Sequence, residues 1–321
     1  MRGIFLTTLV LALISCGGED FASPPTSGGE VPAPTPAPGV LNTGEVKLTA
    51  SSTLIAASLE FTSSKQLGSN LGDETDTGST SDRSTELNSP SFSLSYTSTA
   101  GYGIADASNS ASFGPERLEF EDDSTVLFAL TDPVQEKFLA LYKPEARTTK
   151  DGETATVSPK LAGTGGWQVT TIGESSSRTR LNFFAYGPTT PVAAMPQSGI
   201  AKYTIFNRGN YARDDAVFYV EGGITLTVNF DNGTVKGSLG GVGRNLFSGG
   251  SAGLIVANID GTIVGNQSGG PTISTRAVHD GEYRLFFVGP AAEEVIITYV
   301  GSDLPDNYVG AIVGVKNRLA I

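Results

Sequence analysis

Residues 225–239, TLTVNFDNGTVKGSL, contain the clearest strand–turn–strand pattern of the chain. Leu226, Val228 and Phe230 alternate with polar residues, and successive side chains of a strand point to opposite sides, so one face of this strand is apolar. Asn232-Gly233 supplies the positive φ angles that a tight hairpin turn requires. The stretch therefore predicts a β-hairpin in which the chain returns along residues 234–239.

Similar strands lie on both sides of this hairpin, and no segment of the chain shows sustained helical periodicity. Residues 191–321 hold about eight strands, enough to close into a small barrel whose interior is filled by side chains. We therefore predict an all-β chain that ends in an eight-stranded antiparallel β-barrel domain, 191–321. The candidate strand segments, nine in number for a barrel of about eight strands, are 216–220, 225–230, 234–239, 254–260, 262–267, 276–278, 283–287, 295–299 and 308–315, with tight turns at Asp260-Gly261 and Asp280-Gly281 and one helical turn at 289–294.

A second β-rich module, residues 46–190, precedes the barrel and ends at the rigid connector Pro188-Thr189-Thr190-Pro191. Within it, residues 68–90 hold almost no apolar side chains and are predicted to form a long exposed loop. Turn signals recur at short intervals elsewhere, as in sheet proteins. The predicted strands are 46–52, 53–63, 91–96, 118–121, 125–130, 138–142, 167–172 and 181–186.

The N-terminus carries an export pattern. Arg2 precedes an apolar run, residues 4–14, that is too short to span a membrane as a mature helix. Leu13-Ile14-Ser15-Cys16-Gly17 follows, and Cys16 is the only cysteine of the chain. This segment resembles the bacterial lipobox, which implies a lipoprotein signal peptide, 1–15, and acylation of Cys16, palmitate included. The alternative is an ordinary secretory signal with an isolated thiol.

Two further features concern the location of the mature chain. Gly17 follows the cysteine, and the absence of aspartate at that position implies, by the same resemblance, the outer membrane and not the inner one. Residues 16–45 are rich in proline, glycine, serine and threonine, a composition that favours extended conformations without a core. We therefore expect a lipidated Cys16 and a flexible tether, 16–45, that anchors the folded part to the membrane.

Composition sets limits on the partners. The chain has 321 residues, 39% of them hydrophobic, and a formal net charge of -12. An acidic surface disfavours nucleic acid and anionic membrane surfaces as partners. Without a second cysteine in the chain, no intramolecular disulfide can form.

Four segments carry a resemblance to a known family: MPQSGIAKY (195–203), TLTVNFDNGTVKGSL (225–239), GEYRLFFVGPAAEEV (281–295) and YVGAIVGVK (308–316). Together they resemble the barrel domain of transferrin-binding protein B-like surface lipoproteins, whose relatives include factor H-binding protein and haem- or haemoglobin-binding proteins. The resemblance implies a β-rich handle before the barrel, display at the cell surface, and an iron- or haem-related ligand. It also implies a TonB-dependent receptor or a surface-lipoprotein exporter as a partner.

The sequence offers little for catalysis. His279 is the only histidine, and no G-x-S-x-G motif accompanies it, so we predict that the protein is not an enzyme. One histidine and one acylated cysteine cannot form a tetrahedral zinc site, and we predict no metal site and no cofactor. Adjacent residues of a helical turn do not face each other, so Glu293 and Glu294 are interpreted as a helix-terminus or surface pair.

The predicted function is capture of a protein or solute ligand by exposed loops. The candidate loops are 68–90, 207–215, 240–253 and 266–275. In the second of these, Arg208, Tyr211 and Arg213 are residue types that commonly anchor interfaces, and they are the candidate binding residues. Two alternatives stay open: a periplasm-facing structural or assembly lipoprotein without an external ligand, and a lipocalin-like carrier of a hydrophobic ligand inside the barrel.

Overall fold

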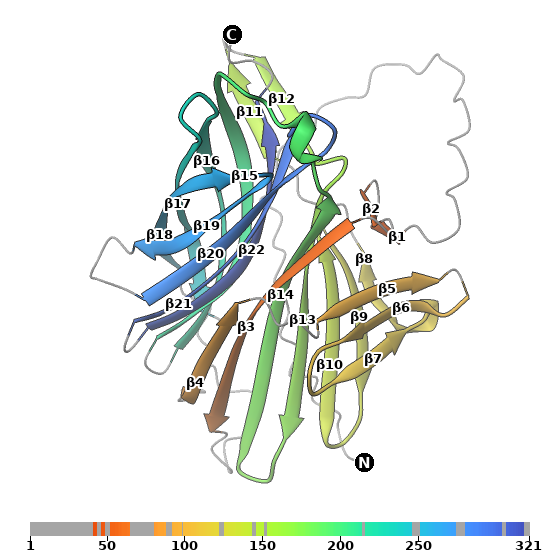
Figure 1. Cartoon of the computed structure of the whole chain (residues 1–321). Helices are drawn as coiled ribbons and strands as arrows, with labels where there is room; N and C mark the ends of the chain where they lie inside the picture. The colour runs from red at the N-terminus through yellow and green to blue at the C-terminus, as the bar shows by residue number, and fades with distance from the viewer. Residues whose placement is uncertain are drawn as a thin grey trace.

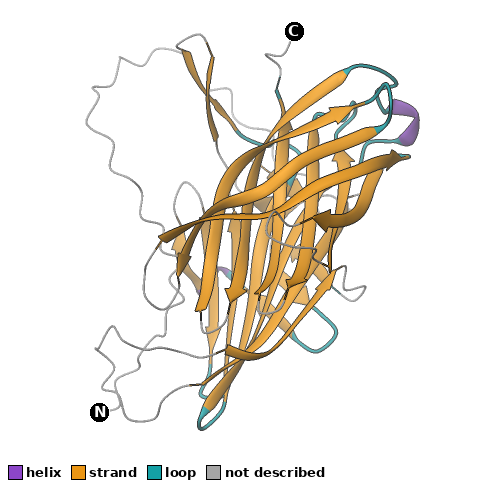
Figure 2. Ribbon diagram, turned by 90° about the vertical axis from the view of Figure 1, so that its left-hand side faces the viewer, coloured by secondary structure: helices purple, strands orange, loops and turns teal. Residues whose placement is uncertain are grey.

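The computed structural model is built almost entirely of strands (Figure 2). The predicted signal peptide, Cys16 and the tether as far as residue 40 lie outside the described residues. Within the described part of the chain, no helix is both long enough and apolar enough to cross a membrane. The structure describes residues 41–43, 46–48, 52–64, 80–87, 92–97, 99–121, 125–142, 146–150, 153–213, 216–245, 251–273, 280–303 and 306–317.

The C-terminal strands close into an eight-stranded antiparallel barrel, as predicted (Figure 1). The register shows the closure, because the first barrel strand pairs with the second on one side and with the last on the other. The strands are β15 (Ile200–Arg213), β16 (Ala216–Asn229), β17 (Thr234–Asn245), β18 (Ser251–Val264), β19 (Gln267–Ile273), β20 (Asp280–Val288), β21 (Glu294–Asp303) and β22 (Asp306–Lys316).

The hairpin of residues 225–239 joins β16 to β17, which confirms the prediction. Asn229 ends β16, and its Oδ1 accepts hydrogen bonds from the backbone N–H groups of Asp231 (2.9 Å) and Asn232 (3.3 Å). Gly233 has a φ angle of 66°, as the Asn-Gly signal predicts, but Asn232 does not have the positive φ angle that the same signal requires, so the connection is a four-residue turn, 230–233, and not a two-residue one.

Two barrel strands are longer than predicted. β16 continues through residues 221–224, and β18 passes straight through Asp260-Gly261, so the predicted turn there is wrong. Gly261 serves close packing instead, because a Cβ at this position would lie 1.9 Å from the Oη of Tyr283. Asp280 begins β20, so the second predicted Asp-Gly turn is also wrong. The predicted strand 276–278 lies outside the described residues.

The predicted helical turn at residues 289–294 is a hydrogen-bonded turn without helical backbone. Gly289 has a φ angle of 90° and Ala292 one of 56°, and both values are incompatible with a right-handed helix. Glu294 then begins β21.

Side chains fill the barrel interior. Tyr203 and Tyr299 are at most 1% exposed. Tyr203 Oη donates to the backbone oxygen of Ala292 at 2.7 Å, and Tyr299 Oη donates to Oδ1 of Asn207 at 2.8 Å. Burial raises the pKa of both phenols, so they stay neutral donors. A hydrophobic ligand inside the barrel would have to displace this packed set, which includes Ile205, Leu226, Val228, Val235, Ile259, Leu285, Phe287, Ile297 and Ile312.

Before the barrel, seven strands form one sheet in the order β4-β3-β14-β13-β10-β9-β8, and three further strands form the sheet β5-β6-β7 (Figure 1). We call these two sheets the handle. Apolar side chains between them form a core around Trp167, Phe184 and Tyr186. The handle strands are β3 (Ser52–Ser64), β4 (Thr80–Leu87), β5 (Ser93–Thr97), β6 (Gly101–Ala105), β7 (Ser110–Phe113), β8 (Leu118–Glu121), β9 (Thr125–Thr131), β10 (Gln135–Tyr142), β13 (Gly163–Ile172) and β14 (Ser176–Pro188). Two separate strand pairs are β1 (Leu41–Thr43) with β2 (Val46–Leu48) and β11 (Ala146–Lys150) with β12 (Glu153–Val157).

The prediction that residues 68–90 form one long loop is wrong for part of that range, because it contains the strand β4. Among the described strands, β4 stands at an edge and pairs with β3 alone. Its sequence, TSDRSTEL, shows no apolar alternation, because Glu86 on one face pairs with a charged side chain while only Leu87 on the other face packs on a hydrophobic core. Edge strands of this kind escape a search for hydrophobic periodicity.

The second face of the seven-stranded sheet packs directly on the outside of the barrel. Phe183 and Leu181 of β14 lie against Ile296 of β21 and Val313 of β22 in one shared hydrophobic core. The handle and barrel therefore form a continuous packed unit, and any surface feature between them has rigid walls.

Candidate functional site

The three candidate binding residues all belong to β15, but the structure gives them different surroundings. Arg208 is 7% exposed and lies at the handle–barrel junction, where its guanidinium carbon is 4.5 Å from the ring centroid of Tyr142 in β10. Its Nη2 is 3.1 Å from Oε1 of Glu221. Tyr211 and Arg213 continue along β15 toward its end, and their side chains lie outside the described set. A binding role for these three residues stays a prediction.

Burial raises the pKa of Tyr142 to about 12, and the positive charge of Arg208 opposes that rise. The phenol is therefore neutral at physiological pH, and Arg208 interacts with the face of its ring. This contact joins the handle to the barrel, so the described environment of Arg208 is structural.

Parts of two of the four candidate loops meet in the folded chain. Thr85 and Leu87, from the predicted loop 68–90, lie opposite Gly269, Gly270 and Pro271, from the predicted loop 266–275. In the structure both segments are strands, β4 and β19. Between them lies a groove of about 820 Å³ at the boundary of handle and barrel, completed by Gly281, Glu282, Tyr283, Arg284 and Val300.

The floor of the groove is the outer face of the barrel. Along β20 the side chains alternate, so Tyr283 points into the barrel core while Glu282 and Arg284 point outward and are exposed. Gly269 and Pro271 of β19 are the strand partners of Arg284 and Glu282. Because neither of them has a long side chain, the floor on the β19 side is low and open.

Tyr283 marks the inner limit of the floor. Burial raises its pKa, and a hydrogen bond of 3.0 Å between its hydroxyl and the Oγ of Ser268 acts in the opposite direction. The phenol is thus held inside the barrel and does not present an acidic group to the groove. The charges offered to a ligand are the carboxylate of Glu282 and the guanidinium of Arg284.

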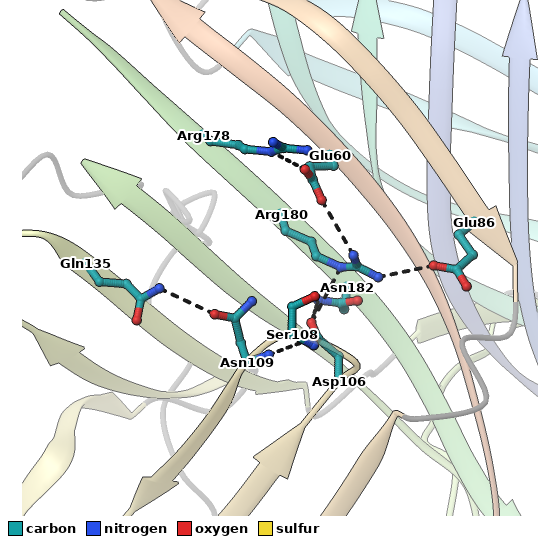
Figure 3. A network of polar contacts seen from close by, with 9 residues as sticks. All are labelled: Glu60, Glu86, Asp106, Ser108, Asn109, Gln135, Arg178, Arg180 and Asn182. Carbon is teal, nitrogen blue, oxygen red and sulfur yellow. Dashed lines mark hydrogen bonds and ion pairs between the residues drawn. The ribbon is translucent and has the colours of Figure 1, made fainter. Parts of the chain in front are cut away.

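The wall of the groove is β4, and a polar network holds this strand in place (Figure 3). Arg180 of β14 reaches across β3, and its guanidinium contacts Glu86 of β4 at 3.2 Å and Glu60 of β3 at 3.5 Å. The same guanidinium lies 3.5 Å from the carboxylate of Asp106, a side chain that is 0% exposed. Removing one partner of such a buried charge pair costs about 3–5 kcal/mol.

The network also includes the three-stranded sheet (Figure 3). Asp106 follows β6, and its Oδ1 accepts hydrogen bonds from the backbone N–H groups of Ser108 (2.8 Å) and Asn109 (2.9 Å). Asn109 in turn accepts a hydrogen bond from Gln135 of β10 at 3.4 Å. The contacts therefore tie both handle sheets to the edge strand that forms the groove wall.

A second buried carboxylate joins the handle to the barrel. Glu294 of β21 is 3% exposed, and its oxygens accept hydrogen bonds from the backbone N–H groups of Lys160 (2.6 Å), Leu161 (3.1 Å) and Ala162 (2.7 Å). Burial raises the pKa of Glu294, and these hydrogen bonds lower it. The interpretation of Glu294 as a surface or helix-terminus residue is therefore wrong, because the handle segment that covers it is distant in sequence. Glu293 is partly exposed and accepts the N–H of Ala291 at 2.9 Å.

Within the described residues, no group of three or more histidine, cysteine, aspartate or glutamate side chains is arranged to hold a metal ion. His279 and Cys16 lie outside those residues. The groove presents one carboxylate, one guanidinium, the side chain of Thr85, backbone groups and small apolar surfaces.

Sequence reasoning missed Glu282 and Arg284. Two charges separated by one aromatic residue in a strand are common on any sheet surface, and only the position of β4 opposite them creates a site. The sequence did contain one signal for a low surface, the Gly269-Gly270-Pro271 run.

No protein-family model matches the chain, and no curated protein matches its sequence. Solved structures with a similar fold include the haemoglobin receptor HpuA from Kingella denitrificans, with a TM-score of 0.40, 17% identity, and coverage of 89% of this chain and 95% of that one. Transferrin binding protein B from Haemophilus parasuis gives a TM-score of 0.39 at 9% identity, covering 83% of this chain and 76% of that one. The N-lobe domain of lactoferrin binding protein B of Moraxella bovis gives 0.36 at 12% identity, covering 81% and 99%.

The solved structures with a similar fold thus include transferrin binding protein B and a haemoglobin receptor, the group of proteins that the four sequence segments resemble. The likeness is one of fold, and at these TM-scores no ligand and no partner is carried over from those proteins to this chain.

Proposed function

We propose that this chain is a non-enzymatic, lipid-anchored lipoprotein of the outer membrane that captures a protein ligand at the groove between handle and barrel. The observation that carries the proposal is the groove itself: about 820 Å³, with one wall from the handle and a floor from the barrel, in a region where both parts are packed as one unit. A preformed site of this kind binds without paying for reorganisation of the protein.

The lipoprotein part of the proposal is supported by the sequence LISCG at residues 13–17 and by the proline-rich segment that follows. An acylated Cys16 would fix one end of the chain, and the tether would hold the groove away from the bilayer. Display at the cell surface, delivery by a surface-lipoprotein exporter and transfer to a TonB-dependent receptor are further parts of the same proposal.

The groove is tested with a variant that fills it. Pro271 lies exposed on the outer face of β19, so Pro271→Trp places a large side chain on the groove floor and leaves the barrel interior unchanged. Val134→Trp is the matched control, because Val134 is 63% exposed in the handle and does not line the groove. The mature Cys16→Ser chain, immobilised, is the reference protein for capture from serum and from growth medium.

The first pure ligands to test are haemoglobin, transferrin and lactoferrin, after which solved proteins of similar fold are named. We expect a captured protein to be lost with Pro271→Trp and retained with Val134→Trp. Equal capture by both variants would refute the groove as the site.

Location is tested separately by adding protease to intact cells. A surface-displayed chain is degraded at once. Degradation only after the outer membrane is broken would favour the periplasm-facing alternative.

A further inference from the structure

The wall of the groove has a free strand edge. β4 is the first strand in the order of the seven-stranded sheet, and within the described residues its one strand neighbour is β3. On the side of β4 away from β3, every second residue directs its backbone N–H and C=O outward, and within the described residues no strand pairs with them. Such an edge is a template for another extended chain.

The part of β4 that lines the groove is regular. Thr85, Glu86 and Leu87 pair in continuous register with residues 57–59 of β3, whereas the register shift of this pair lies nearer the start of β4. The opposite edge of the sheet differs, because β8 has a register shift between Leu118 and Phe120 that interrupts its pairing with β9. A bulge of this kind protects an edge from pairing. The segment of β4 at the groove has no register shift, and its one charged side chain there, Glu86, is paired with Arg180.

The charges on the groove floor have the spacing of a strand. Glu282 and Arg284 are two residues apart on β20 and point to the same side, about 7 Å from each other along the strand. An extended segment lying in the groove presents its own alternate side chains at the same interval. A segment that runs along β20 and carries a basic and an acidic side chain two residues apart would therefore meet Glu282 and Arg284 together.

From this free edge and this charge pair, we infer that the groove binds an extended polypeptide segment that adds as a further strand to β4 and places a basic and an acidic side chain, two residues apart, on Glu282 and Arg284. The inference rests on the proposed function and names the form of the ligand. Backbone hydrogen bonds to β4 supply affinity, and the two floor charges supply the direction of the segment. The low surface of Gly269 and Pro271 leaves room for the side chains that point toward the barrel.

The test uses the mature Cys16→Ser chain and blocked synthetic peptides. The first peptide is Thr-Val-Lys-Val-Glu-Val-Thr, the second exchanges its lysine and glutamate, and the third carries lysine at both positions. A fourth peptide is the better binder of the first two, N-methylated at alternate residues so that one edge loses its hydrogen-bond donors. Affinity is measured by titration, and amide hydrogen exchange is measured for residues 85–87.

We expect one charge order to bind better than the other and better than the double-lysine peptide, by about two- to fivefold for each exposed ion pair. N-methylation is expected to weaken binding about tenfold or more, and the bound peptide to slow exchange at residues 85–87. In the double variant Glu282→Arg with Arg284→Glu, the preferred charge order is expected to invert. Urea unfolding is used to check that this double variant is as stable as the wild type, so that a changed preference reports on binding.

Peptides that fail to bind, that leave exchange in β4 unchanged, or whose preference does not invert would overturn strand addition. If Pro271→Trp still abolishes capture of the protein ligand in that case, capture at the groove stands and only its mode is refuted. Capture that survives Pro271→Trp refutes the proposed function itself. A small molecule that co-purifies in the groove and blocks every peptide would likewise overturn the inference.

Discussion

Replacing Glu294 by glutamine tests the contact that joins barrel to handle. The carboxylate accepts hydrogen bonds from three consecutive backbone N–H groups, at residues 160–162, while its side chain is almost completely buried. Glutamine keeps the length of the side chain and one acceptor oxygen. Its amide group, however, directs N–H donors at a site where the handle supplies only N–H donors.

The expected loss follows from these contacts. A hydrogen bond to a charged group contributes about 1.5–3 kcal/mol, and an N–H left unpaired in a buried position, as at Ala162, costs about 1–3 kcal/mol. The neutral amide recovers part of the desolvation penalty of the buried charge. We therefore expect Glu294→Gln to lower the free energy of unfolding by about 1–3 kcal/mol. Glu294→Ala, which leaves all three N–H groups without an acceptor, is expected to cost about 3–5 kcal/mol.

Urea unfolding of the mature Cys16→Ser chain measures these changes, and hydrogen exchange at residues 160–162 locates them. Glu293→Gln is the matched control, because Glu293 is its sequence neighbour but is partly exposed, and its carboxylate accepts a hydrogen bond from Ala291 within the same turn. The control is expected to change stability by less than about 0.5 kcal/mol. If Glu294→Gln and Glu293→Gln destabilise the protein equally, or if exchange at 160–162 is unaffected, the assigned role of Glu294 is refuted.

Three further predictions concern pH, packing and the junction. Burial raises the pKa of Glu294 above its ordinary value of 4.5, so between that value and its folded pKa the native state binds more protons than the unfolded state. The stability that this group contributes is thus fully present below pH 4.5 and is lost as the pH rises through the folded pKa. Urea unfolding at several pH values should show this fall of the unfolding free energy with rising pH in the wild type and not in Glu294→Gln. Gly261→Ala brings a methyl group against the hydroxyl of Tyr283 and should lower the free energy of unfolding by about 1–3 kcal/mol. The loss should be smaller when Tyr283→Phe, which removes that hydroxyl, is added. An equal loss in the presence and absence of Tyr283→Phe would contradict the packing role of Gly261. Arg208→Met removes the guanidinium from the ring of Tyr142 and should lower the free energy of unfolding by about 0.5–2 kcal/mol, measured by thermal or urea unfolding. Unchanged stability would contradict the structural role of Arg208 at the junction.

The barrel was predictable because its strands carry local signals. Residues 225–239 alternate and turn within fifteen positions, and the register of β16 with β17 follows from that stretch alone. The Asp260-Gly261 turn was predicted wrongly because the glycine serves close packing there, where the hydroxyl of Tyr283 leaves no space for a Cβ. Short-range turn chemistry does not distinguish a glycine that turns the chain from one that makes room for a neighbour.

The candidate site was only partly predictable. Two of the loops chosen for their composition contain β4 and β19, which border the groove, but their strand character was not foreseen. β4 lacks hydrophobic alternation because Glu86 on one of its faces pairs with Arg180, a residue of another strand. Arg208 was selected as an interface residue by type, and its burial against Tyr142 depends on a strand far away in the sequence.

Neighbouring residues are enough to show that this chain is β-rich and that an export and acylation pattern precedes its folded part, because strand, hairpin and lipobox signals are local. Closure of the barrel depends on the pairing of β15 with β22, which are distant in sequence. The tertiary structure alone decided that β4 stands opposite β20, that Glu294 is buried beneath residues 160–162, and that an open groove lies between handle and barrel. The physical reason is that burial and the meeting of charges depend on which surfaces pack together. That choice is made by the summed apolar contacts of the whole chain, and no local pattern records it.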